Sequence, residues 1–181
     1  MSKFYTGNGD KGKTSLPGYN GVSKDDPIIV AIGSVDELNS NIGLAIQYIH
    51  DEKIKTELLN IQNDLFMLGA DLACTLRGET KNKLDERQVS RLAGNIKELG
   101  DFVGDLNEFV LPGGGKDASH LHILRSITRR VETNIVNAAN TNKYKLNENA
   151  LAYINRLSSY FFVAALYLNK INGIKEIHPH Y

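Results

Sequence analysis

The sequence is poor in several residue types: among its 181 residues there is one cysteine, Cys74, and no tryptophan. One cysteine cannot form an internal disulfide, and such low use is typical of a reducing cytoplasm. Residues 1–10 lack the basic, apolar and small-residue regions of a signal peptide. The longest apolar run, residues 160–168, is far shorter than the ~20 residues of a membrane-spanning helix. These absences predict a cytoplasmic protein without a membrane partner.

Net charge is also absent, since 21 Lys and Arg balance 21 Asp and Glu. Binding of nucleic acid by bulk attraction needs a basic excess or a basic face, so we expect no nucleic-acid partner. Hydrophobic residues make up 41% and charged residues 23% of the chain, which is ordinary for a globular domain with its own core. The length predicts a single domain over residues 1–181.

Apolar residues recur at helical spacing in five segments: 35–49, 54–72, 89–103, 121–135 and 151–168. Ser34 and Glu37 have the spacing of a capping box that would start the first helix, and Asn147 is the expected cap of the fifth. No segment alternates as a strand does, so the sheet content should be minimal. The predicted fold class is all-α, a five-helix antiparallel bundle with a glycine-rich N-terminal loop. We expect a loop segment at 1–33, the bundle at 34–172 and a tail at 173–181.

Residues 7–14, GNGDKGKT, match the P-loop expression G-x-x-x-x-G-K-[ST]. A P-loop needs a strand before it and a helix after it, but Pro17, Gly18 and Gly21 follow and are poor in a first helical turn. A P-loop fold is therefore disfavoured, and a flexible terminal segment is the plain alternative. The local chemistry still suits a polyphosphate, because closely spaced glycines let backbone N–H groups approach an anion. Cations and hydroxyls surround these glycines at Lys11, Lys13, Thr14, Ser15 and Lys24.

Arg125, Arg129 and Glu132 share one face of the fourth predicted helix, while Arg130 points away from it. A solvated face with a weak Arg–Glu pair is one interpretation. A DNA-recognition helix is disfavoured by the zero net charge and by the missing helix-turn-helix spacing. Asp36 is expected in the first turn of the first helix, where an acid gains from the helix dipole. It could instead pair with an arginine of another helix and hold that guanidinium in place.

Four blocks in this order resemble the PduO-type ATP:cob(I)alamin adenosyltransferases. Residues 5–15, YTGNGDKGKTS, resemble the family's N-terminal ATP loop, Y-T-x-x-G-D-x-G-x-[ST]-[ST]. SKDDP at 23–27 and GSVDELN at 33–39 are similar to its K-D-D and G-[ST]-x-D-E-L-N segments. The P-G-G and R-x-x-x-R-R-x-E signatures are matched within 111–114 and 125–132, and N-R-L-S at 155–158. Gly7-Asn8 replaces a more usual pair, and Ser159 stands where the family generally carries an acid.

The resemblance implies a homotrimer of five-helix bundles in which ATP and the corrinoid meet at subunit interfaces. It implies that two catalytic residues, Asp36 and Arg125, form an interfacial salt bridge. It also implies that Phe109 presses on the lower face of the corrin, although core packing is the plain alternative for this side chain. Mg²⁺ would be carried by the ATP. The implied ATP-binding residues are Thr6, Gly7, Asn8, Gly9, Lys11, Thr14, Ser15, Lys24, Arg129, Arg130, Glu132, Thr133 and Asn155.

The implied reaction is attack of Co(I) of cob(I)alamin on C5′ of ATP, giving adenosylcobalamin and tripolyphosphate. Because cobalt is the nucleophile, the protein need not provide one, and Cys74 is expected to be a small core residue. A reductase and a cobalamin-dependent enzyme that receives the product are further expected partners. The alternative is a non-catalytic ATP-binding helical module that regulates a partner. Both interpretations predict ATP binding, but only the enzyme predicts the two products.

Histidines and tyrosines carry weaker signals. His120 and His122 face different directions on a helix and make a poor metal pair, so no metal site is assigned. A mobile tail is expected to hold His178 and His180, with a corrinoid contact left open. Three tyrosines recur every seven residues on the fifth predicted helix and form one aromatic stripe. Core packing is the simplest explanation of this stripe, and contact with a partner helix in an oligomer is the alternative. This stripe consists of Tyr153, Tyr160 and Tyr167.

Overall fold

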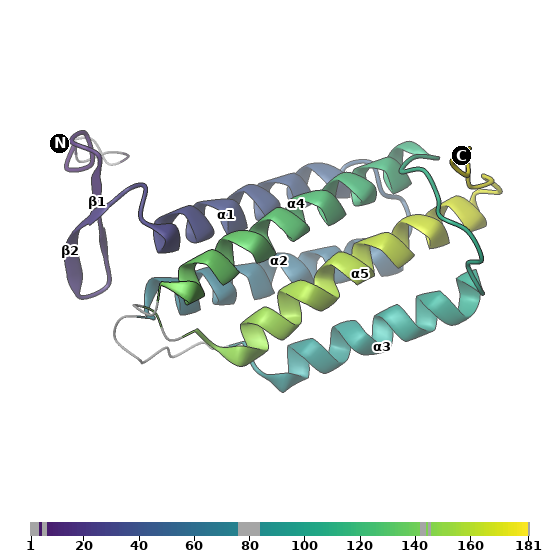
Figure 1. The fold of residues 1–181 in the computed structure, drawn as a ribbon. Helices are drawn as coiled ribbons and strands as arrows, with labels where there is room; N and C mark the ends of the chain where they lie inside the picture. Colours follow the sequence, from purple (N-terminus) through teal and green to yellow (C-terminus); the bar gives the residue numbers. More distant parts are fainter. Residues whose placement is uncertain (1–3, 5–6, 76–83, 142–143, 145, 181) are drawn as a thin grey trace.

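The computed structural model describes residue 4 and residues 7–75, 84–141, 144 and 146–180. In this part of the chain a short hairpin precedes five helices, which confirms the all-α fold class (Figure 1). The helices form an elongated bundle, with the hairpin at the end where the first helix begins. In order, the elements are β1 (Lys13–Leu16), β2 (Tyr19–Ser23), α1 (Pro27–Ile46), α2 (Glu52–Ala73), α3 (Glu86–Val103), α4 (Lys116–Asn140) and α5 (Glu148–Ile171).

Helix α1 begins eight residues earlier than the capping-box pattern predicted, since its N-cap is Asp26 rather than Ser34. Pro27 occupies the first helical turn, where its missing N–H costs nothing, and the side chain of Asp26 caps the helix by accepting from the N–H of Ile28 at 3.1 Å. The capping box at Ser34 is therefore wrong, and the Ser34 hydroxyl donates to the Ala31 carbonyl inside the helix. Asp36 consequently lies in the third turn, too far from the helix start to gain from the dipole.

The glycine-rich segment contains the antiparallel hairpin β1–β2, which the sequence did not predict. Its pairs include Lys13 with Ser23 and Thr14 with Val22. The chain reverses next to Gly18, whose φ of 82° favours glycine. The two strands are four and five residues long, and the ladder is irregular between Thr14 and Leu16. Strands this short show too few alternations for a period of two to be visible in the sequence.

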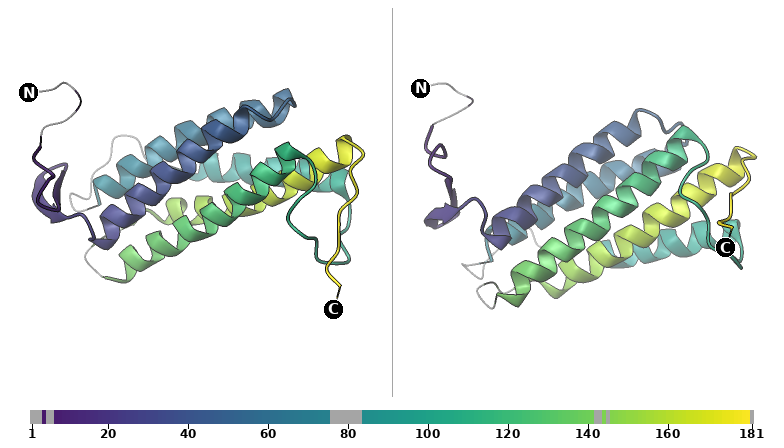
Figure 2. Two further views of the ribbon diagram at one scale, coloured as in Figure 1. Left: turned by 90° about the horizontal axis from the view of Figure 1, so that it is seen from above. Right: turned by 45° about the horizontal axis from the view of Figure 1, so that its top comes forward.

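The helices pack in the pairs α1–α2, α1–α4, α4–α5 and α3–α5. The first three pairs are antiparallel, as predicted, but α3 and α5 run in the same direction (Figures 1 and 2). Lys170 in the last turn of α5 donates to the carbonyls of Phe102 and Val103 at the end of α3, at 3.0 and 2.9 Å. Because α3 packs on α5 rather than on α4, the connection over residues 104–115 has to cross the end of α5. That crossing explains its length.

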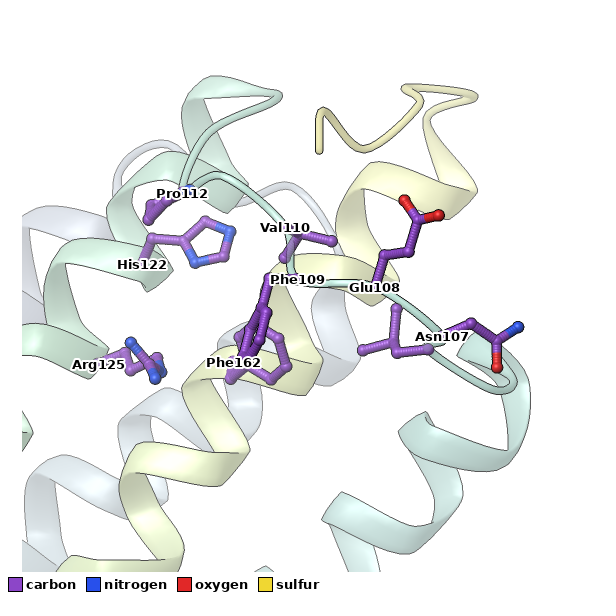
Figure 3. A pocket seen from close by; sticks show the side chains of 9 residues that line it. Asn107, Glu108, Phe109, Val110, Pro112, His122, Arg125 and Phe162 are labelled. Carbon is purple, nitrogen blue, oxygen red and sulfur yellow. The ribbon is translucent and has the colours of Figure 1, made fainter. Parts of the chain in front are cut away.

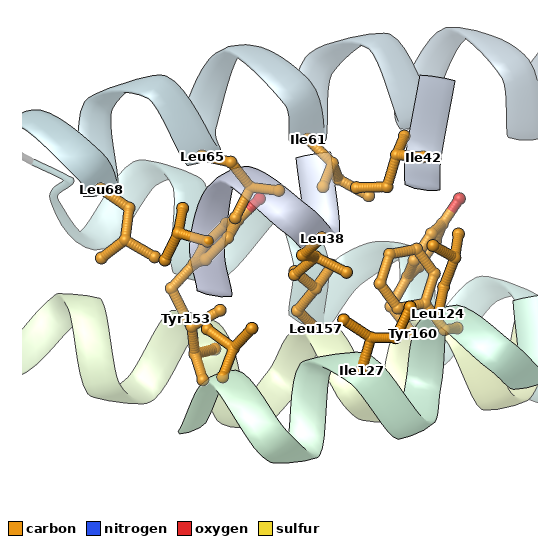
Figure 4. Packing of buried hydrophobic residues seen from close by; sticks show 14 of the residues in the cluster. Leu38, Ile42, Ile61, Leu65, Leu68, Leu124, Ile127, Tyr153, Leu157 and Tyr160 are labelled. Atoms are coloured by element: carbon orange, nitrogen blue, oxygen red, sulfur yellow. The ribbon is translucent and has the colours of Figure 1, made fainter. Parts of the chain in front are cut away.

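The core is formed by the predicted apolar stripes (Figure 4). Core packing is confirmed for two members of the tyrosine stripe, since Tyr153 and Tyr160 are 0% and 1% exposed. Tyr167 is half-buried against Phe102, with ring centroids 5.1 Å apart. Cys74 does not join the core as expected, because it is the half-buried C-cap residue of α2. Within the described ranges, no helix is both long and apolar enough to span a bilayer.

One buried charge cluster joins α2, α3 and α5. Arg91 lies 3.0 Å from a carboxylate oxygen of Glu57 and forms a second, closer ion pair with Asp64. The hydroxyl of Tyr153 donates to the same Asp64 carboxylate at 2.7 Å. Burial, and then the nearby Asp64 charge, raise the pKa of Tyr153 well above its ordinary value of 10.0. The guanidinium of Arg91 therefore compensates two carboxylates that are 8% and 3% exposed.

Candidate functional site

The predicted phosphate-binding residues gather around a hollow of about 520 Å³ on the N-terminal hairpin. Backbone hydrogen bonds fold the glycine segment tightly: the N–H of Gly12 donates to the Gly9 carbonyl, and the N–H of Lys24 donates to the Gly12 carbonyl. Gly7 and Gly12 both have φ of 74°. Thr6 lies outside the described residues. The residues that line the hollow are Asn8, Gly9, Lys11, Lys13, Thr14, Ser15 and Gly21.

Lys24 adds a cation beside this hollow. A Cβ on Gly9 would lie 3.1 Å from the Lys24 ammonium nitrogen, so the glycine lets the ammonium lie close to the backbone. None of Lys11, Lys13 and Lys24 forms a salt bridge with a described carboxylate. Cations without a carboxylate partner among the described residues, next to a glycine-rich backbone, are physical features of an anion site.

On the outer face of α4, Arg129 forms the Arg–Glu pair that the solvated-face interpretation expects, with 2.8 Å between Arg129 Nη1 and Glu132 Oε2. Arg130 points elsewhere, as predicted, and lies 2.6 Å from the carboxylate of Glu37 on α1. Thr133 and Asn155 are exposed, on α4 and α5. Sequence reasoning placed Glu37 in a capping box and so missed its pairing with Arg130, which depends on how α1 and α4 pack.

At the opposite end of the bundle lies an apolar cavity of about 450 Å³ (Figure 3). Phe109 faces it from the crossing loop and is 80% exposed, so core packing is the wrong explanation of this side chain. The guanidinium carbon of Arg125 lies 5.4 Å from the ring centroid of Phe162, within the range of a cation–π contact. The cavity thus offers aromatic faces and one cation to an occupant.

His122 forms the inner wall of this cavity. It is 5% exposed, and its ring centroid is 6.1 Å from that of Phe162. Its Nε2 atom is buried and has no hydrogen-bond partner among the described residues. Burial, and then the Arg125 charge, lower the pKa of His122 below its ordinary value of 6.5. The sequence did not single out His122 or Phe162 as site residues, although the spacing of three between His122 and Arg125 was a usable signal.

The two sites do not meet within one chain. The hairpin hollow lies where α1 begins, and the apolar cavity lies where α4 begins, at the other end of the bundle (Figures 1 and 2). Asp36 is exposed on α1 and has no ion-pair or hydrogen-bond partner among the described residues. The predicted pairing of Asp36 with Arg125 is therefore absent within the chain and stays a prediction about contacts between copies. In the described part of the chain, no group of three or more His, Cys, Asp or Glu could hold a metal ion.

The fold and these sites define a class of protein: a helical bundle with a glycine-rich, lysine-bearing hairpin at one end and a separate aromatic cavity at the other. Residues 4–168 match the cobalamin adenosyltransferase family, and the chain belongs to it. A corrinoid adenosyltransferase of Bacillus subtilis is 43% identical over 180 residues, covering 97% of this chain and 91% of that protein. A cobalamin adenosyltransferase of Cupriavidus metallidurans is 39% identical and covers 98% and 94%.

Solved structures show the same likeness. A variant PduO-type ATP:corrinoid adenosyltransferase from Lactobacillus reuteri, complexed with cobalamin and ATP, superposes with a TM-score of 0.90. It is 38% identical, and the match covers 99% of this chain and 100% of that one. A second variant, complexed with ATP, gives a TM-score of 0.89 over 97% and 99%. Because these matches cover nearly the whole of both chains, they include both the hairpin and the crossing loop of this protein.

Proposed function

We propose that this protein transfers the 5′-deoxyadenosyl group of ATP to the Co(I) centre of cob(I)alamin. Cobalt attacks C5′, the C5′–O bond breaks, and tripolyphosphate leaves with the electron pair, so the products are adenosylcobalamin and tripolyphosphate. The exposed Phe109 carries this proposal from the chain itself. A phenyl ring left 80% exposed over an aromatic cavity is unfavourable in water and favourable against a large flat ligand. The full-length likeness to a structure complexed with cobalamin and ATP supports the same ligand.

The hairpin hollow would hold the triphosphate. Backbone amides of residues 7–9, the ammonium groups of Lys11 and Lys24, and the hydroxyls of Thr14 and Ser15 would stabilise the charge that grows on the leaving group. Mg²⁺ would arrive with the ATP and share this task. Thr6 belongs to the same proposed set. The rest of the nucleotide would contact Arg129, Arg130, Glu132, Thr133 and Asn155.

The aromatic cavity would hold the lower face of the corrinoid. An apolar ring at the lower axial position displaces any ligand that donates electron density to cobalt, and reduction to Co(I) becomes easier as that donation falls. Phe109 would supply this ring, and Phe162 would support it from α5. Arg125, held over Phe162 at 5.4 Å, would keep its charge at the cavity edge.

A working site would need more than one copy of the chain. The hairpin projects beyond the end of its own bundle (Figure 2), so it can reach the α4 face of a neighbour more readily than its own. A homotrimer in the cytoplasm is the assembly we propose, with Asp36 of one copy paired to Arg125 of the next. A reductase that delivers Co(I) and an enzyme that uses adenosylcobalamin would complete the set of partners.

A spectroscopic assay with chemically reduced cobalamin and ATP tests the proposal. We expect adenosylcobalamin and tripolyphosphate in equal amounts. ATP binding without either product would instead favour the regulatory module. Arg129→Ala should strongly weaken turnover while the helical circular-dichroism signal is kept, because its pair with Glu132 is exposed and adds little stability. Lys97→Ala, which breaks an exposed pair on α3, is the matched control and should turn over normally.

A further inference from the structure

The C-terminal residues 174–178 are tied to the crossing loop that carries Phe109. The N–H of Leu111 donates to the Ile177 carbonyl at 2.7 Å. The Nδ1 atom of His178 lies 2.9 Å from the carbonyl oxygen of Phe109, and 3.5 Å from a carboxylate oxygen of Glu108. The expectation of a mobile tail is therefore wrong for this stretch. Two hydrogen bonds hold the loop backbone on either side of Val110.

The side chain of Asn169 anchors both the crossing loop and the C-terminal residues 174–178. Its side chain is 0% exposed and accepts from the N–H of Gly115 at 2.9 Å. Its amide group donates to the Gly113 carbonyl at 3.1 Å and to the Glu176 carboxylate at 3.0 Å. The N–H of Ile174 also donates to the Asn169 carbonyl. The tail is thus fixed to the rigid end of α5, and a fixed tail can in turn hold the loop.

Phe109 has few other restraints. It lies in residues 104–115, which contain no helix or strand, and its side chain is 80% exposed. A ring with so little packing takes its position from its backbone. Among the described residues, His178 makes the one hydrogen bond to the Phe109 backbone, so the imidazole helps to set where the ring stands over the cavity.

We propose that His178 is a positioning residue that holds Phe109 over the cavity by donating from Nδ1 to the Phe109 carbonyl. The donation requires the tautomer with a proton on Nδ1, and a carboxylate oxygen of Glu108 lies 3.5 Å from the same atom. The role of Phe109 toward the corrinoid rests on the proposed function, whereas the restraint on the loop does not. Loss of one such hydrogen bond should raise the ratio of displaced to docked loop about fivefold.

The absence of tryptophan in the chain makes Phe109→Trp a single fluorescent reporter of this position. In that background, His178→Ala should lower the fluorescence anisotropy and increase quenching by acrylamide. His178→Asn should restore both values, because the Asn amide nitrogen takes nearly the same place as imidazole Nδ1. His180→Ala is the matched control, since His180 is exposed in the same tail. Unchanged fluorescence in His178→Ala would overturn the proposal.

Turnover in the chain with Phe109 intact supplies the second readout. His178→Ala should lower kcat with cob(I)alamin about fivefold, leave KM for ATP unchanged, and regain activity in His178→Asn. If His178→Ala loosens the Phe109→Trp reporter but leaves kcat of the chain with Phe109 unchanged, the restraint does not serve the reaction. That result would also overturn the proposal. If the parent chain makes no adenosylcobalamin, the proposed function fails, and the fluorescence comparison still decides whether His178 positions residue 109.

Discussion

The side-chain amide of Asn169 occupies the space in which any residue other than glycine at position 114 would carry its Cβ. A Cβ there would lie 2.1 Å from the Asn169 amide oxygen and 2.3 Å from its nitrogen. Gly114 also has φ of 100°, which side chains rarely allow. Gly114 is thus explained by the way the crossing loop closes over the end of α5.

Gly114→Ala should reduce the free energy of unfolding by about 3 kcal/mol, because it combines a strained backbone with an overlap against a buried amide. Urea denaturation measures this loss. Gly113→Ala is the control, since a Cβ at Gly113 meets nothing within 4 Å, and its effect should stay within about 0.5 kcal/mol. Equal stability of the two variants would contradict the packing of Asn169 against Gly114.

Arg91→Leu should destabilise the fold by about 3 kcal/mol, since Glu57 and Asp64 would remain buried without their cation. Tyr153→Phe removes one hydrogen bond from the same Asp64 carboxylate and should cost about 1–2 kcal/mol. Both losses are measured by urea denaturation. An effect of Arg91→Leu no larger than that of Tyr153→Phe would contradict the role of Arg91 in compensating two carboxylates.

His122 should make the fold less stable in mild acid. Its pKa is lowered in the folded chain by burial and by Arg125, so the unfolded chain binds a proton near pH 6.5 while the folded chain still resists it. The contribution of neutral His122 to the free energy of unfolding is therefore fully present above pH 6.5 and is lost as the pH decreases below that value. His122→Gln should flatten this part of the pH profile, measured as unfolding free energies at pH 7 and pH 5.

The control for this prediction lies within the same experiment. Between pH 7 and pH 8.5 a histidine is neutral in both the folded and the unfolded chain, so the two profiles should run parallel there. Identical slopes for the parent and the variant on the acid side would contradict the assignment to His122.

Asp36→Ala should lower kcat/KM more than it lowers stability, because the exposed carboxylate has no partner in its own chain among the described residues. A double-mutant cycle with Arg125→Ala tests the proposed pairing between copies, and a coupling of about 1–3 kcal/mol in kcat/KM is expected. Ser40→Ala, one turn further along the exposed side of α1, is the matched control. Strictly additive losses would exclude a direct Asp36–Arg125 contact.

Local sequence patterns predicted much of the fold. Apolar periodicity placed five helices, and the glycines and Lys11 of the predicted anion site line one hollow, with Lys24 beside it. The errors were also local. Asp26 followed by Pro27 is as good a helix-start signal as Ser34 with Glu37, and in the structure α1 begins at the first of these two signals. The apolar stripe alone could not decide between them, because both starts keep the same face toward the core.

By itself, the sequence determined which segments are helical and which faces are apolar, since these follow from spacing along one chain. Tertiary structure alone decided that α3 packs against α5, that residues 104–115 cross the bundle end, and that His178 meets Phe109. Contacts between residues 69 positions apart depend on how helix faces pack in three dimensions, and no periodicity in the sequence encodes that choice.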